Sequence, residues 1–128
     1  MSAVLAHPLP AFALNRTKQV FLATELRCAN RFLSRLRGLL LTRRRDFAAG
    51  CGLWITPSKG VHMFGMSYPI DAVYLDGQQR VVHVHPHLRP WQVAAIRADA
   101  SSVLELPDGT IARTRTELGD QICIQAQP

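Results

Sequence analysis

Short apolar segments separated by turn-forming residues follow one another along the second half of the chain. Residues 70–75 are a mostly apolar run that ends at Asp76–Gly77, a dipeptide typical of tight turns. Residues 80–85 then alternate between two faces, which is the period of a half-buried strand. We therefore expect these two segments to form a hairpin. Similar patterns predict strands over residues 19–25, 53–56, 102–106 and 121–125.

The first half of the chain contains one helical pattern. Asn30 is a suitable N-cap, and the apolar residues around it recur at offsets of three and four along one side. They are Ala29, Phe32, Leu33, Leu36 and Leu40. Gly38 is placed to end or loosen this helix. We expect an amphipathic helix after Asn30, and a shorter helical turn over residues 110–115.

Several short strands at nearly even spacing, with one early amphipathic helix, predict the fold class. It is a mainly β (α+β) fold, a small antiparallel barrel or jelly-roll-like sandwich. Alternating strand and helix units are missing, which disfavours a doubly wound parallel sheet. The chain has 128 residues, 48% of them hydrophobic, which suits one domain with an ordinary core. We place that domain at residues 16–128, after a flexible N-terminal arm over residues 1–15 that contains two prolines.

The basic residues are concentrated towards the N-terminus. The net charge is +6, yet residues 1–45 hold nine basic residues against one acidic residue. A solvated helix face is the simplest interpretation. The alternative is docking to nucleic acid or an anionic membrane through Arg31, Arg35, Arg43, Arg44 and Arg45. Few aromatic residues lie near these arginines, so no stacking platform for single strands is evident and nucleic acid is disfavoured as a partner.

The cysteine pattern and the lack of targeting signals bear on the cellular setting. Three cysteines without a close CxxC pair argue against a disulfide framework and against a cysteine-rich zinc site. The N-terminus lacks the basic region of a secretory signal, and no stretch approaches the ~20 apolar residues that a membrane-spanning helix needs. We therefore expect a soluble protein in a reducing, cytoplasmic compartment.

Three sequence blocks carry a resemblance to a known family. They are Arg-Gly-Leu-Leu at residues 37–40, Val-His-Met-Phe-Gly-Met-Ser-Tyr-Pro-Ile-Asp at residues 61–71, and Val-Leu-Glu-Leu-Pro-Asp-Gly-Thr at residues 103–110. A Gly-Asp pair follows at residues 119–120. In this order the blocks resemble domain of unknown function 192, a UPF0127-like family. The resemblance implies a compact, mostly β fold of jelly-roll or barrel kind and implies no particular activity.

The 61–71 segment is the first candidate site. Asp71 places a carboxylate among apolar neighbours, and a buried carboxylate must be hydrogen-bonded or change its pKa. In one interpretation His62, Phe64, Met66 and Asp71 line a ligand-binding pocket under this loop. In the other, Asp71 accepts backbone N–H bonds from residues 62–68 and only fixes the loop, while the methionines and the phenylalanine fill the core.

Two histidines on one strand are the second candidate. The side chains of His83 and His85 lie on the same face of the expected strand, about 6.5–7 Å apart, so that two imidazoles can share a metal ion. A metal site usually needs a third or fourth ligand, for which His62, Asp71 and Cys51 are candidates. The alternative is a polar stripe on a half-exposed sheet.

Two further residues have weaker signals. Cys51 and His62 are conceivable as a nucleophile and its base, but no nucleophile elbow surrounds Cys51. Glu105 lies between Leu104 and Leu106, whose side chains face the other way. We expect Glu105 to be exposed, or to pair with an arginine of the basic helix.

These signals favour a binding or accessory protein over an enzyme. No complete catalytic set is present, and we expect no cofactor. The preferred function is binding of a small ligand or a protein partner at the 61–71 loop. The first alternative is a metal-dependent protein or enzyme that uses His62, Asp71, His83 and His85. The second alternative is docking of the basic helix.

Overall fold

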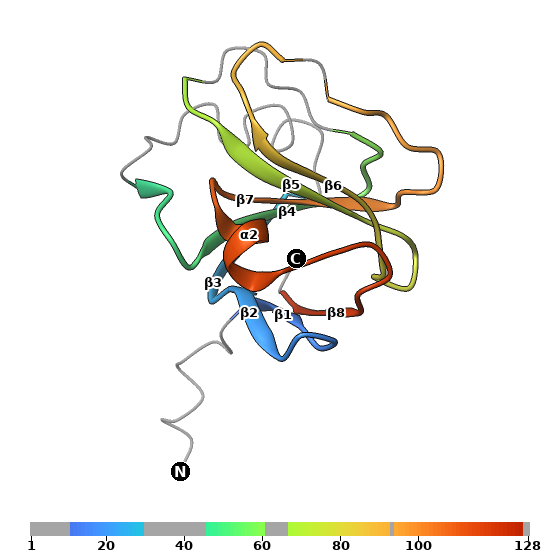
Figure 1. Ribbon diagram of the computed structural model, residues 1–128. Coiled ribbons are helices and arrows are strands. Elements are labelled where there is room, and N and C mark those ends of the chain that lie inside the picture. The colour runs from blue at the N-terminus through green and yellow to red at the C-terminus, as the bar shows by residue number, and fades with distance from the viewer. Residues whose placement is uncertain (1–10, 30–45, 61–66, 93, 127–128) are drawn as a thin grey trace.

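The computed structural model describes residues 11–29, 46–60, 67–92 and 94–126, and it contains two β-sheets and one short helix (Figure 1). The larger sheet has five strands in the order β3-β4-β7-β5-β6, and the smaller has three in the order β2-β1-β8. All pairs of neighbouring strands are antiparallel except β3 and β4, which are parallel. The large sheet consists of β3 (Glu25–Ala29), β4 (Cys51–Ile55), β7 (Ser102–Pro107), β5 (Ile70–Leu75) and β6 (Val81–Leu88). The small sheet consists of β2 (Val20–Ala23), β1 (Phe12–Asn15) and β8 (Ile122–Gln125), and the helix is α2 (Thr110–Thr114).

The five-stranded sheet is covered by an apolar layer on each face. We call the face towards the small sheet and α2 the inner face, as Figure 1 shows them on the same side. Buried residues of β1, β2, β8 and α2 meet those of the large sheet there, among them Leu22, Val73, Leu104, Ile111 and Ile122. We call the opposite face the outer face. Its layer consists of Phe47, Leu53, Ile55, Tyr68, Ile70, Ala72, Tyr74, Leu88, Ala94, Ala100 and Val103.

The sequence prediction of a mainly β, sandwich-like α+β fold is confirmed. The two sheets stay separate, so the arrangement is a sandwich and not a closed barrel. The expected hairpin is present, because the Asp76 carboxylate accepts hydrogen bonds from the backbone N–H groups of Gln78 and Arg80, both at 2.9 Å. The helix expected after Asn30 falls within residues 30–45, outside the described residues.

Two expectations near the N-terminus need correction. Residues 12–15, assigned to a flexible arm, form β1 in the centre of the small sheet, where the buried Asn15 side chain donates to Thr116 and Asp120. The single strand expected over residues 19–25 is two strands in different sheets. The break is at Thr24, because the N–H groups of Thr24 and its successor both donate to the carbonyl of Gly50.

The crossing of β2, β3 and β4 leaves no room for a side chain at Gly52. A Cβ atom there would lie 2.8 Å from the Ala23 Cβ and 3.1 Å from the Leu26 Cδ1. Overpacking of this kind costs about 1–3 kcal/mol. We therefore expect Gly52→Ala to lower the free energy of unfolding by that amount, measured by urea denaturation. The control is Gly77→Ala, whose Cβ would meet nothing closer than 3.7 Å, and equal stability of both variants would contradict this packing.

Candidate functional site

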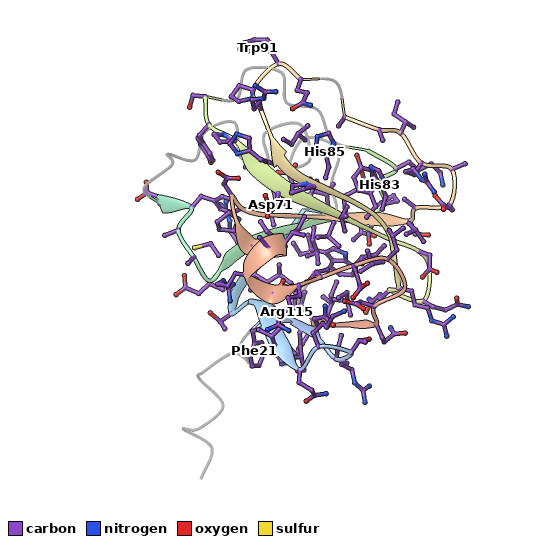
Figure 2. The ribbon with its side chains drawn as sticks, viewed as in Figure 1. Phe21, Asp71, His83, His85, Trp91 and Arg115 are labelled. Carbon is purple, nitrogen blue, oxygen red and sulfur yellow. The ribbon has the colours of Figure 1, made fainter. Side chains whose placement is uncertain are left out.

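Asp71 is completely buried on the inner face and is fully hydrogen-bonded (Figure 2). One carboxylate oxygen accepts from the backbone N–H of His87 at 2.9 Å, and the other accepts from the backbone N–H of Ile111 at 2.8 Å. Ile111 lies in the first turn of α2, where backbone N–H groups lack partners within the helix. Asp71 therefore joins the end of β6 to the start of α2. Of the donors expected from residues 62–68, residues 62–66 lie outside the described residues.

A second contact joins the same two segments at the surface. The His87 backbone has a φ of +51°, and its imidazole Nδ1 lies 2.9 Å from a carboxylate oxygen of Asp108, in the turn before α2. Asp71 thus accepts a hydrogen bond from the backbone of His87, and Asp108 contacts its side chain. Together these contacts give Asp71 a scaffold role between β6 and α2.

The pairing of β5 with β6 places Asp71 and the two histidines, His83 and His85, on opposite faces of the sheet. Ala72 pairs with His85 and Tyr74 with His83, so both imidazoles share the outer face with these partners. Asp71, the neighbour of Ala72, points the opposite way, and in Figure 2 it lies close to α2 while the histidines lie along β6. The expectation that Asp71 could complete a metal site with the two histidines is therefore wrong.

The environment of His83 is aromatic and partly buried. Its ring meets the Tyr74 ring edge-on, with the centroids 4.9 Å apart. Burial lowers the pKa of His83, and the charges of Arg97 and His85 lower it further. Within the described residues no group of three His, Cys, Asp or Glu side chains is arranged to hold a metal ion. A metal at His83 and His85 stays a prediction.

Glu105 is the unusual residue of the outer face. It pairs with Leu53 of β4 and with Ala72 of β5, in the middle of the sheet, and its exposed fraction is only 6%. No hydrogen bond or ion pair to its carboxyl group is found in the described part of the chain. Burial raises the pKa of Glu105 to about 8, so the group is mainly neutral at pH 7. The expectation of an exposed Glu105 is therefore wrong. Pairing with an arginine of the basic helix stays a prediction, because that helix falls outside the described residues.

Tyr68 brings a second unpaired polar group to the same layer. Its hydroxyl is buried and has no hydrogen-bond partner among the described residues, and its ring packs against Phe47 with centroids 6.4 Å apart. Burial raises the pKa of Tyr68; the negative charge of Glu105 raises it further, whereas Arg27 lowers it. Glu105 and Tyr68 are thus within electrostatic range of each other. By contrast, the Tyr74 hydroxyl, also on the outer face, donates to the carbonyl of Ala95 at 2.6 Å.

Several predicted site residues lie outside the described residues. They are His62, Phe64, Met66, Arg31, Arg35, Arg43, Arg44 and Arg45. Ligand contacts of the first three and docking by the arginines therefore stay predictions. The sulfur of Cys51 lies 3.8 Å from a carboxylate oxygen of Glu25 and 3.7 Å from the carbonyl oxygen of Asp46. Both neighbours are hydrogen-bond acceptors. A pair of Cys51 with His62 stays a prediction, because His62 lies outside the described residues.

The burial of Glu105 was not anticipated from the sequence, and Tyr68 was not singled out. A signal for Glu105 was present, since Val103, Leu104 and Leu106 place apolar side chains on both faces of one strand, which is typical of a central, doubly covered strand. A glutamate within such a strand has to be buried. Nothing local in the sequence distinguishes Tyr68 from an ordinary core tyrosine.

The comparison with known proteins assigns a family. The model of DUF192, described as "Uncharacterized ACR", matches residues 13–124. The chain belongs to this family. A UPF0127 protein of Thermococcus sibiricus is 32% identical over 114 residues, which cover 85% of this chain and 71% of the relative. A UPF0127 protein of Pyrococcus horikoshii is also 32% identical over 114 residues, covering 85% of this chain and 95% of the relative.

Two solved structures share the fold of this DUF192 protein. A protein of unknown function from Novosphingobium aromaticivorans superimposes with a TM-score of 0.73 at 17% identity, covering 90% of this chain and 84% of the other. A putative transcription regulator from Sinorhizobium meliloti gives 0.72 at 19% identity, covering 89% and 91%. At these identities the likeness shows the fold alone. No helix among the described residues is long and apolar enough to cross a membrane.

Asp71→Asn tests the scaffold role of Asp71. An asparagine side chain has one carbonyl oxygen, so one of the two backbone N–H groups loses its acceptor. We expect the free energy of unfolding to fall by about 2–3 kcal/mol, measured by urea denaturation. The control is Asp99→Asn, which removes the charge from an exposed carboxylate paired with Arg97 and should change stability little. Equal stability of the two variants would contradict the scaffold role.

The pKa of Glu105 predicts how stability depends on pH. The unfolded chain releases this proton near the ordinary pKa of 4.5, whereas the folded protein keeps it to about 8. The contribution of Glu105 to the free energy of unfolding is fully present below pH 4.5. It is lost as the pH rises to 8, at roughly 1 kcal/mol per pH unit. Glu105→Gln removes this dependence, because glutamine does not titrate.

Urea denaturation of both proteins at pH 5, 6, 7 and 8 measures the effect. Groups common to both proteins cancel in the difference, so the wild type should lose stability relative to Glu105→Gln as the pH rises. If the free energies of unfolding of the two proteins change with pH in the same way, the Glu105 carboxyl is solvated or paired.

Proposed function

We propose that this DUF192 protein binds a small ligand at the outer face of its five-stranded sheet, through Glu105 and Tyr68. Two observations carry the proposal. Among the described residues the buried Tyr68 hydroxyl has no hydrogen-bond partner, and Glu105 is only 6% exposed, with a pKa that burial raises to about 8. Both belong to the outer layer, and they are within electrostatic range of each other. A ligand that hydrogen-bonds to both groups would satisfy them together.

The cost of these two groups supports a role beyond folding. A buried polar group without a hydrogen bond destabilises a protein by about 1–3 kcal/mol, and almost all buried polar groups in native proteins are satisfied. A leucine and a phenylalanine at these positions would avoid that cost. Perturbed, unpaired groups of this kind are typical of binding and active sites.

The proposed site includes part of the 61–71 segment expected from the sequence, but it is centred on Glu105 and Tyr68 instead of on Asp71. His62, Phe64 and Met66 precede Tyr68 by at most six residues, so they stay candidate ligand contacts. Asp71 is not a ligand contact in this proposal, because both of its oxygens are occupied on the inner face. Its contribution is to hold β6 and α2 in place behind the sheet.

Binding is proposed in preference to catalysis on chemical grounds. Two hydrogen-bonding groups suffice to hold and orient a ligand. A reaction would require a nucleophile or a positioned base at the same place in addition. Glu105 and Tyr68 are therefore assigned only the role of hydrogen-bonding to a ligand.

Retention of small molecules from a cell extract tests this function. The wild type is incubated with a protein-free extract of its expression host and washed, and the bound compounds are identified by mass spectrometry. We expect at least one compound that the wild type retains and that Glu105→Leu and Tyr68→Phe both release. The control is Tyr74→Phe, which removes a neighbouring hydroxyl that already has a partner and should retain the compound. If no retained compound depends on Glu105 and Tyr68, the proposed function is wrong.

A further inference from the structure

The charges around Glu105 and Tyr68 are predominantly acidic. Glu25 pairs with Cys51, and Arg27 pairs with Leu53, so both point to the outer face from β3. Asp46 raises the pKa of Tyr68 as Glu105 does, which places its charge near the hydroxyl. Among the described residues this end of the outer face thus carries three carboxyl groups and one guanidinium. With Glu105 neutral, the charges of Glu25 and Asp46 still outnumber that of Arg27, so the field attracts cations and repels anions.

Two aromatic rings lie in the same layer. Phe47 and Tyr68 form a tilted pair there. The face of an aromatic ring attracts an ammonium group, and this attraction is strongest where water is excluded. A carboxyl group beside aromatic rings is a combination suited to an organic cation with an apolar body.

We propose that the ligand is a primary amine with an apolar body, whose ammonium group donates hydrogen bonds to the Glu105 carboxylate and to the Tyr68 hydroxyl oxygen. This inference rests on the proposed function and names its ligand class. An anionic ligand would face three carboxyl groups at this end of the sheet. A neutral ligand would gain nothing from the charges of Glu25 and Asp46.

Binding of an ammonium group to Glu105 makes the ligand affinity depend on pH. The free protein holds Glu105 mainly in its neutral form at pH 7. When the ammonium group binds, the carboxylic acid releases its proton to solvent and the carboxylate pairs with the cation. Affinity should therefore rise with pH up to about 8, and it should be about 50-fold tighter at pH 8 than at pH 6.

Other titratable groups near this face also affect how the ligand affinity depends on pH, and their effect must be distinguished from that of Glu105. The titratable and charged groups on the elements packed around it are Glu25, Arg27, Asp46, Cys51, Tyr68, Tyr74, His83, His85 and Arg97. Glu105→Gln leaves all of them in place and removes only the group to which the proton release is assigned. The variant should lose both the affinity and its rise with pH.

Three matched probes test the ligand class: hexylamine, hexanol and hexanoate, which share one apolar body and carry a cationic, a neutral and an anionic head group. Binding is followed by NMR shifts of the backbone amides of Leu53, Ala72 and Glu105 at pH 6, 7 and 8. We expect hexylamine to bind at least tenfold more tightly than the other two at pH 8. Glu105→Gln should weaken hexylamine at least tenfold, whereas Tyr74→Phe should bind it as the wild type does.

The outcomes separate this inference from the proposed function. If hexanol or hexanoate binds at these amides through Glu105 and hexylamine does not, the ammonium assignment is wrong and the binding site stands. Equal hexylamine affinity in the wild type and Glu105→Gln also overturns the assignment. If none of the three probes shifts the amides, the assignment fails, and the proposed function is judged by the extract experiment alone.

Discussion

The structure depends on β7 being paired on both edges and covered on both faces. It lies between β4 and β5, so every side chain of the strand faces an apolar layer. Leu104 and Leu106 fit the inner layer and Val103 fits the outer one. Glu105 is the exception, because its carboxyl group occupies a position where the packing calls for an apolar side chain. That conflict between position and chemistry is the basis for the functional account.

Two buried carboxyl groups in this protein show opposite solutions to the same problem. Asp71, on the inner face, accepts a backbone N–H bond at each of its two carboxylate oxygens. Glu105, on the outer face, finds no donor among the described residues and keeps its proton to a pKa of about 8. The first arrangement stabilises the junction of β6 and α2. The second costs stability and leaves hydrogen-bonding capacity for a ligand. Burial alone therefore does not identify a functional carboxyl; the lack of a partner does.

Local sequence patterns predicted most of the strands, and long-range contacts explain the failures. The strand over residues 70–75 and its turn follow from an apolar run and a turn dipeptide, both of which are local. The division between β2 and β3 depends on the Gly50 carbonyl, which no local pattern specifies. The burial of Asp71 was foreseen, but its donors lie 16 and 40 residues away along the chain. The alternation along β7 does not by itself show that Glu105 is buried, because burial depends on the apolar layers that cover both faces of the strand.

The central claim is that the Glu105 carboxyl is buried, unpaired and neutral at physiological pH. A carboxyl-detected NMR titration with 13C-labelled glutamate, assigned by comparison with Glu105→Gln, measures this directly. The account predicts that the Glu105 signal titrates with a midpoint near 8. A midpoint near the ordinary value of 4.5 would show a carboxylate that is solvated or paired in the free protein, and it would contradict the account.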